Sequence, residues 1–299
     1  MQTYRVPFTG YQTSRLVFGC MRLPREYADA RLPIHAALEA GIDFFDHADI
    51  YGGGNCETVF GNVWADGVKR EDIVLQSKCG IRPGRYDYSF EHIMASVDGS
   101  LSRLKTDYLD ILLLHRPDLL MEPDEVGEAF DALQAAGKVR YFGVSNFTPA
   151  LLDMLSPALT QTLVANQIQL SLSHYDAFDS YLVKGYGEDR TPTRGEGIIE
   201  YAMTHGICLQ AYGPLGGGGM MRDTDSALGA KLTELAGELD ASREAVALAW
   251  LLRHPVGIMP VLGSMNPERI AGAAKATDIE LTREQWYELY LAARGQRLP

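Results

Sequence analysis

The sequence lacks the features that define several large classes of protein. No run approaches the ~18 apolar residues of a membrane-spanning helix, and no basic segment followed by an apolar one opens the chain. The four cysteines, Cys20, Cys56, Cys79 and Cys208, are scattered and form no CxxC pair. This spacing indicates neither a disulfide scaffold nor a zinc site. We therefore expect a cytoplasmic protein without a membrane partner.

Basic charge is also scarce. The chain has 27 Lys and Arg against 39 Asp and Glu, which gives a formal net charge of −12. This balance argues against sequence-independent binding to nucleic acid or to anionic membranes. A small anionic ligand remains compatible with it, because a few local cations or backbone N–H groups are enough to bind one. We expect a small-molecule partner and no nucleic acid, and the oligomeric state is open.

The spacing of the seven histidines does not favour a metal site. They form no HxH or HExxH pair. His47 adjoins Asp46 on an expected strand, so the two side chains face opposite sides of the sheet. We interpret His47 as structural and expect no metal.

What the sequence does contain is a regular alternation of short apolar segments with helical patterns. Apolar residues on consecutive positions, as in ILLL, are typical of parallel strands covered on both faces. Eight such units in 299 residues predict an α/β fold, a (β/α)8 TIM barrel forming a single domain over residues 1–299. The expected strands are 16–20, 42–49, 72–79, 108–115, 139–145, 163–171, 206–212 and 257–263.

Helical spacing is clearest in residues 29–41, 91–104 and 124–138, with Gly137 as a helix stop, and an extra helix is expected in the C-terminal residues 281–299. Two irregular segments, 174–197 and 213–225, follow expected strands, where barrel enzymes place their binding loops.

Polar residues that suit acid–base chemistry follow the ends of three successive strands: Asp46 and Tyr51, then Lys78, then His115. These ends converge on one mouth of a barrel. A Lys ammonium fixed by a carboxylate lowers the pKa of a nearby phenol, and a neutral His can orient a carbonyl oxygen. The set suits hydride addition to a carbonyl. Each residue alone has an ordinary structural explanation, as a cap, an ion-pair partner, a surface group or a packed aromatic.

The order of the motifs DHADIYG, QSKCG, LLLHRP and GVSNF resembles the aldo-keto reductase family from about residue 16 to about residue 276. HADIYGG, HRPDLLM and FGVSNFTP are similar to a branch of bacterial oxidoreductases within it. The resemblance implies that Tyr51 is the proton donor, that Lys78 and Asp46 tune it, and that His115 orients the substrate carbonyl.

The resemblance also implies a nicotinamide cofactor, although the sequence contains neither GxGxxG after a strand nor GxxxxGK. The expected cofactor is NADPH, with NADH as an alternative. By resemblance, Ser145, Asn146 and Gln167 meet the carboxamide, and the nicotinamide ring stacks on Tyr212.

Further cofactor contacts are implied at three places. Many family members have a lysine where Gly263 stands, and its loss weakens the expectation of a strict NADPH preference. The implied residues are the end of the first strand (Gly19, Cys20 and Met21), the glycine-rich segment (Gly213, Leu215 and Gly217) and the adenosine end (Ser264, Asn266 and Arg269).

The expected substrate pocket is open, with walls from Met21, residues 81–89 and the loop after His115. These walls suggest that aromatic or aliphatic aldehydes and ketones are accepted. The leading hypothesis is an NADPH-dependent oxidoreductase that reduces such carbonyls. The alternative is an NADPH-binding redox-sensing or regulatory subunit with little turnover, because channel-associated relatives keep the same four residues. The physiological substrate and the direction of reaction stay open.

Overall fold

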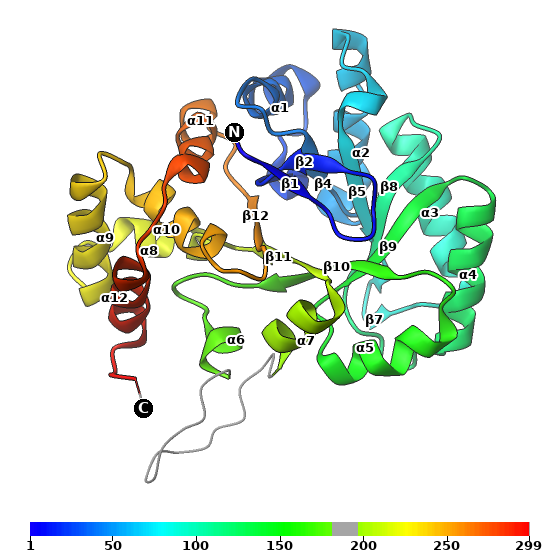
Figure 1. The fold of residues 1–299 in the computed structure, drawn as a ribbon. Coiled ribbons are helices and arrows are strands. Elements are labelled where there is room, and N and C mark those ends of the chain that lie inside the picture. Colours follow the sequence, from blue (N-terminus) through cyan, green and yellow to red (C-terminus); the bar gives the residue numbers. More distant parts are fainter. Residues whose placement is uncertain (181–196, 299) are drawn as a thin grey trace.

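The computed structural model, which describes residues 1–180 and 197–298, is a closed barrel of eight parallel strands surrounded by helices (Figure 1). Each of the eight expected segments contains one barrel strand, so the predicted (β/α)8 fold is confirmed. Around the barrel the strands run in the order β3 (Val17–Gly19), β4 (Phe44–Asp46), β5 (Val74–Cys79), β8 (Leu109–Leu114), β9 (Val139–Ser145), β10 (Leu163–Gln169), β11 (Cys208–Tyr212) and β12 (Met259–Leu262), which pairs with β3.

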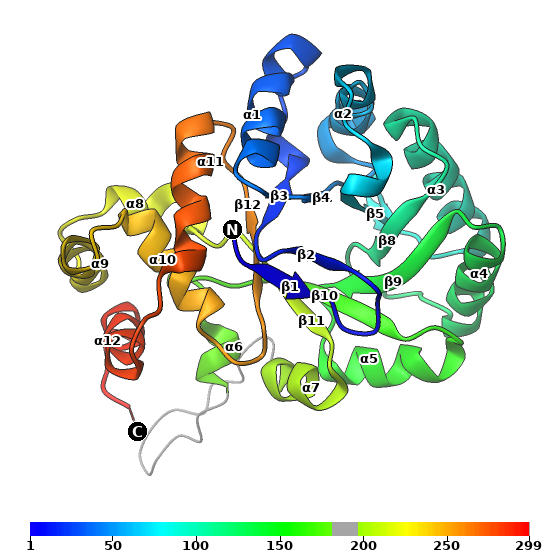
Figure 2. The ribbon, with the colours of Figure 1, turned by 45° about the horizontal axis from the view of Figure 1, so that its top comes forward.

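The helices form a ring outside the strands (Figure 2). The expected helices at 29–41, 91–104, 124–138 and 281–299 correspond to α1, α3, α4 and α12, and Gly137, with φ of +70°, follows α4. The helix bounds are α1 (Tyr27–Glu39), α2 (Asn55–Phe60), α3 (Phe90–Leu104), α4 (Pro123–Ala135), α5 (Pro149–Leu155), α6 (Asp176–Asp179), α7 (Ile198–His205), α8 (Gly219–Arg222), α9 (Ala227–Glu238), α10 (Arg243–Leu252), α11 (Pro267–Ala274) and α12 (Arg283–Arg294).

Burial on both faces explains the continuous apolar runs of the strands. All six residues of β8 are buried. Ile111 and Leu113 point into the barrel, where they join Phe44 and Val74 in an inner apolar cluster, whereas Leu112 belongs to the outer core beneath the helices. The apolar filling makes the barrel a solid support for the polar residues at its C-terminal end.

An N-terminal hairpin was not expected from the sequence. Its strands β1 (Thr3–Arg5) and β2 (Gln12–Ser14) are antiparallel. Val6 is buried against the inner apolar cluster, and Tyr11 donates to Asp110 near the start of β8, so the hairpin covers the N-terminal end of the barrel (Figure 2). Strands of three residues are too short to show an alternating pattern, which is why the sequence did not reveal them.

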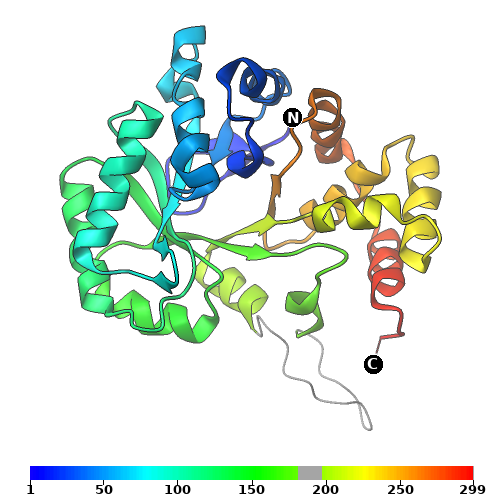
Figure 3. The same cartoon turned by 180° about the vertical axis from the view of Figure 1, so that it is seen from behind.

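The extra helix α12 packs beside α9 (Figures 1 and 3). Trp286 of α12 stacks on Trp250 of α10, with ring centroids 5.1 Å apart. No helix within residues 1–180 and 197–298 is long and apolar enough to cross a membrane. Of the irregular segment predicted at 174–197, residues 181–196 lie outside the described part of the chain.

Candidate active site

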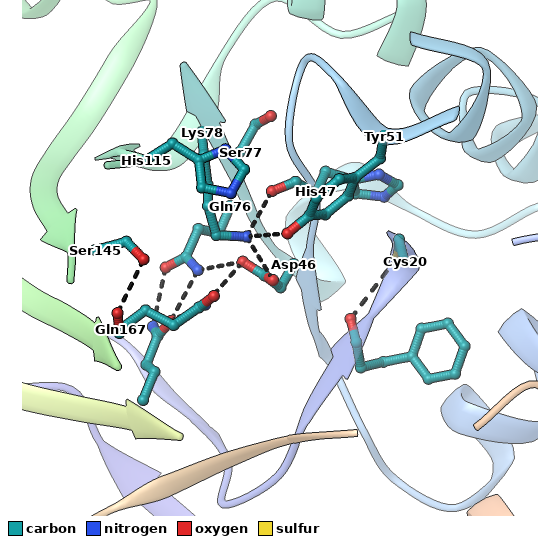
Figure 4. Close-up of polar contacts among 12 residues, drawn as sticks. Cys20, Asp46, His47, Tyr51, Gln76, Ser77, Lys78, His115, Ser145 and Gln167 are labelled. Atoms are coloured by element: carbon teal, nitrogen blue, oxygen red, sulfur yellow. Dashed lines mark hydrogen bonds and ion pairs between the residues drawn. The ribbon is translucent and has the colours of Figure 1, made fainter. Parts of the chain in front are cut away.

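Asp46, Tyr51, Lys78 and His115 come together at the C-terminal end of the barrel, as the sequence predicted (Figure 4). Asp46 ends β4, Lys78 lies near the end of β5, and His115 directly follows β8. Tyr51 is carried by the loop after β4. The three glycines 52–54 that follow it all have positive φ, a region that favours glycine. The tight turn they form brings Tyr51 back over the strand ends.

The Lys78 ammonium links three partners. It donates to Asp46 Oδ2 at 2.6 Å, to the backbone carbonyl of His47 at 2.9 Å and to Tyr51 Oη at 3.0 Å. An ammonium has three N–H donors, so all are used. Because Tyr51 Oη accepts from Lys78, its own proton is available for donation into the pocket.

Burial changes the expected acidity of Tyr51. The nearby Lys78 lowers the pKa of the phenol, as the sequence suggested, but burial raises it by more, and the net pKa lies above 10. Burial lowers the pKa of Lys78, whereas Asp46 and Tyr51 raise it by more, so the lysine is charged. The lysine thus acts on the phenol in the predicted direction, and burial, which the sequence does not show, outweighs it. Tyr51 holds its proton at neutral pH, which is the state a proton donor requires.

His115 is neutral at physiological pH. Burial, followed by the charges of Lys78 and Arg116, lowers its pKa to about 3. Its ring lies nearly perpendicular to that of Tyr51, with centroids 5.8 Å apart. A neutral imidazole beside a protonated phenol can hydrogen-bond to a carbonyl oxygen without competing for the proton.

Two buried glutamines, Gln76 and Gln167, contact Asp46 (Figure 4), and a third, Gln210, joins them. Gln76 Nε2 donates to Asp46 Oδ1 at 2.5 Å, and Gln167 Nε2 donates to the same oxygen at 3.2 Å. Gln210 accepts from both glutamines at 2.8 Å. Gln76 and Gln210 were not predicted from the sequence. Their signal was the two-residue spacing that places Gln76 on the face of Lys78, and Gln210 on the face of Tyr212.

A cavity of about 890 Å³ opens above these residues and extends to Ser264 and Arg269. Met21, Ile81 and Arg116 line it, in agreement with the predicted walls at residue 21, at 81–89 and after His115. Lys78 lies behind the lining, where it contacts Asp46 and Tyr51. The predicted residues in the lining are Gly19, Met21, Asp46, Tyr51, His115, Ser145, Asn146, Gln167, Tyr212, Gly213, Leu215, Gly217, Ser264 and Arg269.

Two predicted cofactor residues are outside this lining. Cys20 is fully buried, and its Sγ points toward the carbonyl of Phe18 (Figure 4). Asn266 is the N-cap of α11, where its Oδ1 accepts from the backbone N–H of Arg269 at 3.0 Å. Asn266 thus orients the helix that carries Arg269.

The residues expected to meet a carboxamide form a connected polar group. Tyr212 Oη donates to Asn146 Oδ1 at 2.9 Å, and Asn146 Nδ2 donates to Ser145 Oγ at 2.8 Å. Asn146 has φ of +63°, a left-handed conformation that asparagine tolerates better than most residues. Amide and hydroxyl groups can both donate to and accept from a carboxamide. The donor set therefore fits the carboxamide of a nicotinamide ring.

The cavity also contains charges that were not predicted from the sequence. Arg222 of α8 and Glu244 of α10 line it, as Arg269 does. A Cβ built on Gly263 would meet nothing within 4 Å, so the missing lysine leaves open space there. Arg222 lies three residues after Gly219, the last glycine of the glycine-rich segment, and this position was the signal that could have revealed it.

His47 lies apart from the cavity. Its fully buried ring packs edge-on against Phe60 with centroids 4.7 Å apart, in agreement with the structural role predicted for it. Among the described residues no group of three or more His, Cys, Asp or Glu side chains could hold a metal ion.

The aldo/keto reductase family model matches residues 15–290 of the chain. The chain belongs to the aldo/keto reductase family. Among curated proteins, the oxidoreductase YcsN of Bacillus subtilis is 41% identical over 96% of this chain and 97% of its own length. A 6-dehydroglucose reductase of Agrobacterium fabrum is 37% identical over 96% of each chain. The predicted family and its bacterial oxidoreductase branch are confirmed.

The solved structures of the family share the fold. The crystal structure of a thermostable aldo-keto reductase, Tm1743, aligns with a TM-score of 0.81 and 26% sequence identity, and the alignment covers 98% of this chain and all of that one. Membership supports an oxidoreductase that acts on small carbonyl compounds, with the tetrad at the strand ends of this barrel.

Proposed function

We propose that this aldo/keto reductase reduces the carbonyl group of aldehydes or ketones with NADPH, and that Tyr51 is the proton donor. The observation that carries the proposal is the position of Tyr51 Oη. It lies 3.0 Å from the Lys78 ammonium in the wall of a cavity that continues to Arg269. A proton donor and a residue suited to binding an anion thus line one cavity of about 890 Å³.

The four residues act together on the substrate carbonyl. Tyr51 and neutral His115 hydrogen-bond to the carbonyl oxygen and orient it. As negative charge develops on this oxygen, Tyr51 transfers its proton, and the adjacent Lys78 stabilises the phenolate that forms. Asp46 keeps Lys78 charged and in place, and the three glutamines keep Asp46 in place.

NADPH supplies the hydride when it is bound. Ser145 and Asn146 are the side chains proposed to hold its carboxamide, with Gln167 below them and Tyr212 against the ring. Gly213 and Gly217 have positive φ, and a Cβ on either would meet nothing within 4 Å, so their backbone is open to close approach by a pyrophosphate. Ser264 and Arg269 are proposed to bind the adenosine phosphate. NADH is the weaker alternative, because Arg269 favours the 2′-phosphate.

Two titrations and one assay test this function. The protein is titrated with NADPH and with NADH, monitored by nucleotide fluorescence, and NADPH consumption is then followed with 4-nitrobenzaldehyde. We expect tighter binding of NADPH and steady turnover of the aldehyde. Tight NADPH binding without turnover of any activated aldehyde would favour a redox-sensing or regulatory subunit. Failure to bind either nucleotide would contradict both functions.

A further inference from the structure

The cavity concentrates positive charge in a protein that is strongly negative overall. Among the described residues that line it, four are arginines and two, Asp46 and Glu244, carry carboxylates. Asp46 is already paired with Lys78. The whole chain has a net charge of −12, so this local excess of cations is contrary to the overall composition. Clefts lined by one sign of charge attract ligands of the opposite sign.

One of the four arginines, Arg116, stands beside the reacting groups. It directly follows His115, and its charge is one of the causes that lower the pKa of that histidine. Its guanidinium extends over the barrel mouth toward β11: Nη2 is 3.5 Å from Tyr212 Oη, and Cζ is 5.8 Å from the Tyr212 ring centroid. The guanidinium is thus held at the part of the cavity where the tetrad acts.

The fold fixes the backbone of Arg116 closely. Tyr88 is buried, and its Oη donates to the Arg116 carbonyl at 2.5 Å and accepts from the Arg116 N–H at 3.0 Å. The Tyr88 ring lies directly against Gly80, where a Cβ would come within 2.0 Å of Tyr88 Cε1. A glycine at position 80 therefore makes room for the tyrosine that clamps Arg116.

Arg116 has no carboxylate partner in residues 1–180 and 197–298. The acid nearest in sequence, Asp118, is used elsewhere. Its Oδ2 accepts from the backbone N–H of Tyr88 at 3.1 Å, and its Oδ1 accepts from that of Leu120 at 3.0 Å. The guanidinium is left with donors that face the cavity.

The adenosine phosphate of a dinucleotide does not account for the charge of Arg116. Arg269 follows β12, and Arg116 follows β8. These two strands are four places apart in the closed barrel of eight, so they lie on opposite sides of it (Figure 1). Arg116 is therefore separated by the width of the barrel from the arginine that we assign to the adenosine phosphate.

We propose that Arg116 binds an anionic group of the substrate, so that the substrates of this enzyme are small aldehydes or ketones that also carry a carboxylate, sulfonate or phosphate. This inference rests on the proposed carbonyl reduction and adds the substrate class to it. The anionic group pairs with the guanidinium while the carbonyl oxygen meets Tyr51 and His115. Charge-assisted hydrogen bonds are the strong ones, and Arg suits planar anions in particular.

The test compares two substrates of similar size, succinic semialdehyde and its methyl ester, in the intact enzyme with saturating NADPH. We expect kcat/KM to be about 10- to 100-fold higher for the anion, which corresponds to a charged hydrogen bond of about 1.5–3 kcal/mol. In Arg116→Leu this ratio should fall to near one, and Arg116→Lys should keep part of it. Arg222→Leu is the matched control, because it removes an equal charge from the same cavity at a residue of α8, away from the segment after His115, and should leave the ratio unchanged.

A wild-type enzyme that reduces the ester as well as the acid would overturn the inference while leaving the proposed function intact. So would a ratio that survives in Arg116→Leu. If neither aldehyde is reduced, calorimetric titration of the protein–NADPH complex still decides the anion site, and the proposed function itself fails only if 4-nitrobenzaldehyde is not reduced either. It should bind 4-hydroxybutyrate at least tenfold more tightly than 4-hydroxybutyramide, and Arg116→Leu should abolish the difference. Equal binding of the two would refute the site.

Discussion

Lys78 is the residue on which the polar site depends. It is buried, and all three of its donors are used by Asp46, His47 and Tyr51. A buried charge without its partner is costly, whereas replacing both partners of a buried pair can be nearly neutral. The structural and catalytic roles of Lys78 can therefore be separated by experiment.

Lys78→Met should lower the free energy of unfolding by about 3–5 kcal/mol, because it leaves the Asp46 carboxylate buried and unpaired. The double variant Asp46→Asn/Lys78→Met should recover most of this loss. Both variants should lack reductase activity, because Tyr51 has no adjacent cation in either. Urea denaturation and NADPH consumption measure the two effects. A double variant as unstable as Lys78→Met would show that the pair does not behave as a buried ion pair.

At the residue scale, the sequence predicted which side chains meet but not how burial acts on them. The order of Asp46, Lys78 and His115 on successive strands was enough to place them at one mouth, because a barrel brings strand ends together. The net pKa of Tyr51 was beyond reach, since it depends on how deeply the phenol is buried. Gln76 and Gln210 were also missed, because an isolated glutamine in an apolar strand carries no motif.

At the scale of elements, the segment between β5 and α3 positions the cavity wall. Gly80 has φ of +105°, and the Tyr88 ring occupies the space where a Cβ would lie. The sequence predicted that residues 81–89 form a wall, but not that Tyr88 clamps the residue after His115. Contacts of this kind join segments far apart in sequence and leave no local pattern.

Gly80→Ala should displace Tyr88 and with it Arg116. We expect it to be less stable than Gly84→Ala by about 1–3 kcal/mol, the usual cost of overpacking. Gly84 is the matched control because its φ is also positive, at +77°, while its Cβ would meet nothing within 4 Å. Thermal denaturation of both variants measures the difference. Equal stabilities would show that the Tyr88 ring yields to the new methyl group without cost.

At the scale of the whole molecule, burial of neutral histidines makes stability depend on pH. The pKa values of His47 and His115 are both lowered to about 3, chiefly by burial. Between pH 6.5 and about 3 the unfolded chain binds protons at these positions that the folded chain does not. Acid therefore destabilises the fold, by about 1.4 kcal/mol per pH unit for each histidine. Asp49 has the opposite effect on stability to one histidine. Burial raises its pKa to about 7, so below this pH the folded chain binds a proton at Asp49 that the unfolded chain does not.

We accordingly expect the urea midpoint to fall between pH 6.5 and pH 5. His47→Leu should show a shallower dependence, because it removes one of the histidines whose pKa burial lowers, His254 being a further one, without touching the cavity. The comparison uses only the slope of the urea midpoint against pH, so a change in the absolute stability of the variant does not affect the result. A stability that rises on acidification, or a slope unaltered in His47→Leu, would contradict the assignment of these histidines as buried and neutral.

The barrel itself was the most predictable part of the molecule. The strands that join the barrel are short and mostly buried, β8 along its whole length, and the helices between them supply the alternation that the sequence shows. The hairpin of β1 and β2 escaped prediction, because six residues of strand give too little pattern. The four arginines of the cavity could not be predicted from the sequence either, because they come from separate segments and meet only in the folded chain.

The account as a whole depends on Tyr51 as the group that gives its proton to the substrate. The most direct measurement compares wild type and Tyr51→Phe in NADPH consumption with 4-nitrobenzaldehyde, together with the NADPH dissociation constant of each. The account predicts a fall in kcat of at least about 100-fold, the usual contribution of a general acid, with NADPH affinity within about twofold of wild type. Wild-type turnover by Tyr51→Phe would contradict it.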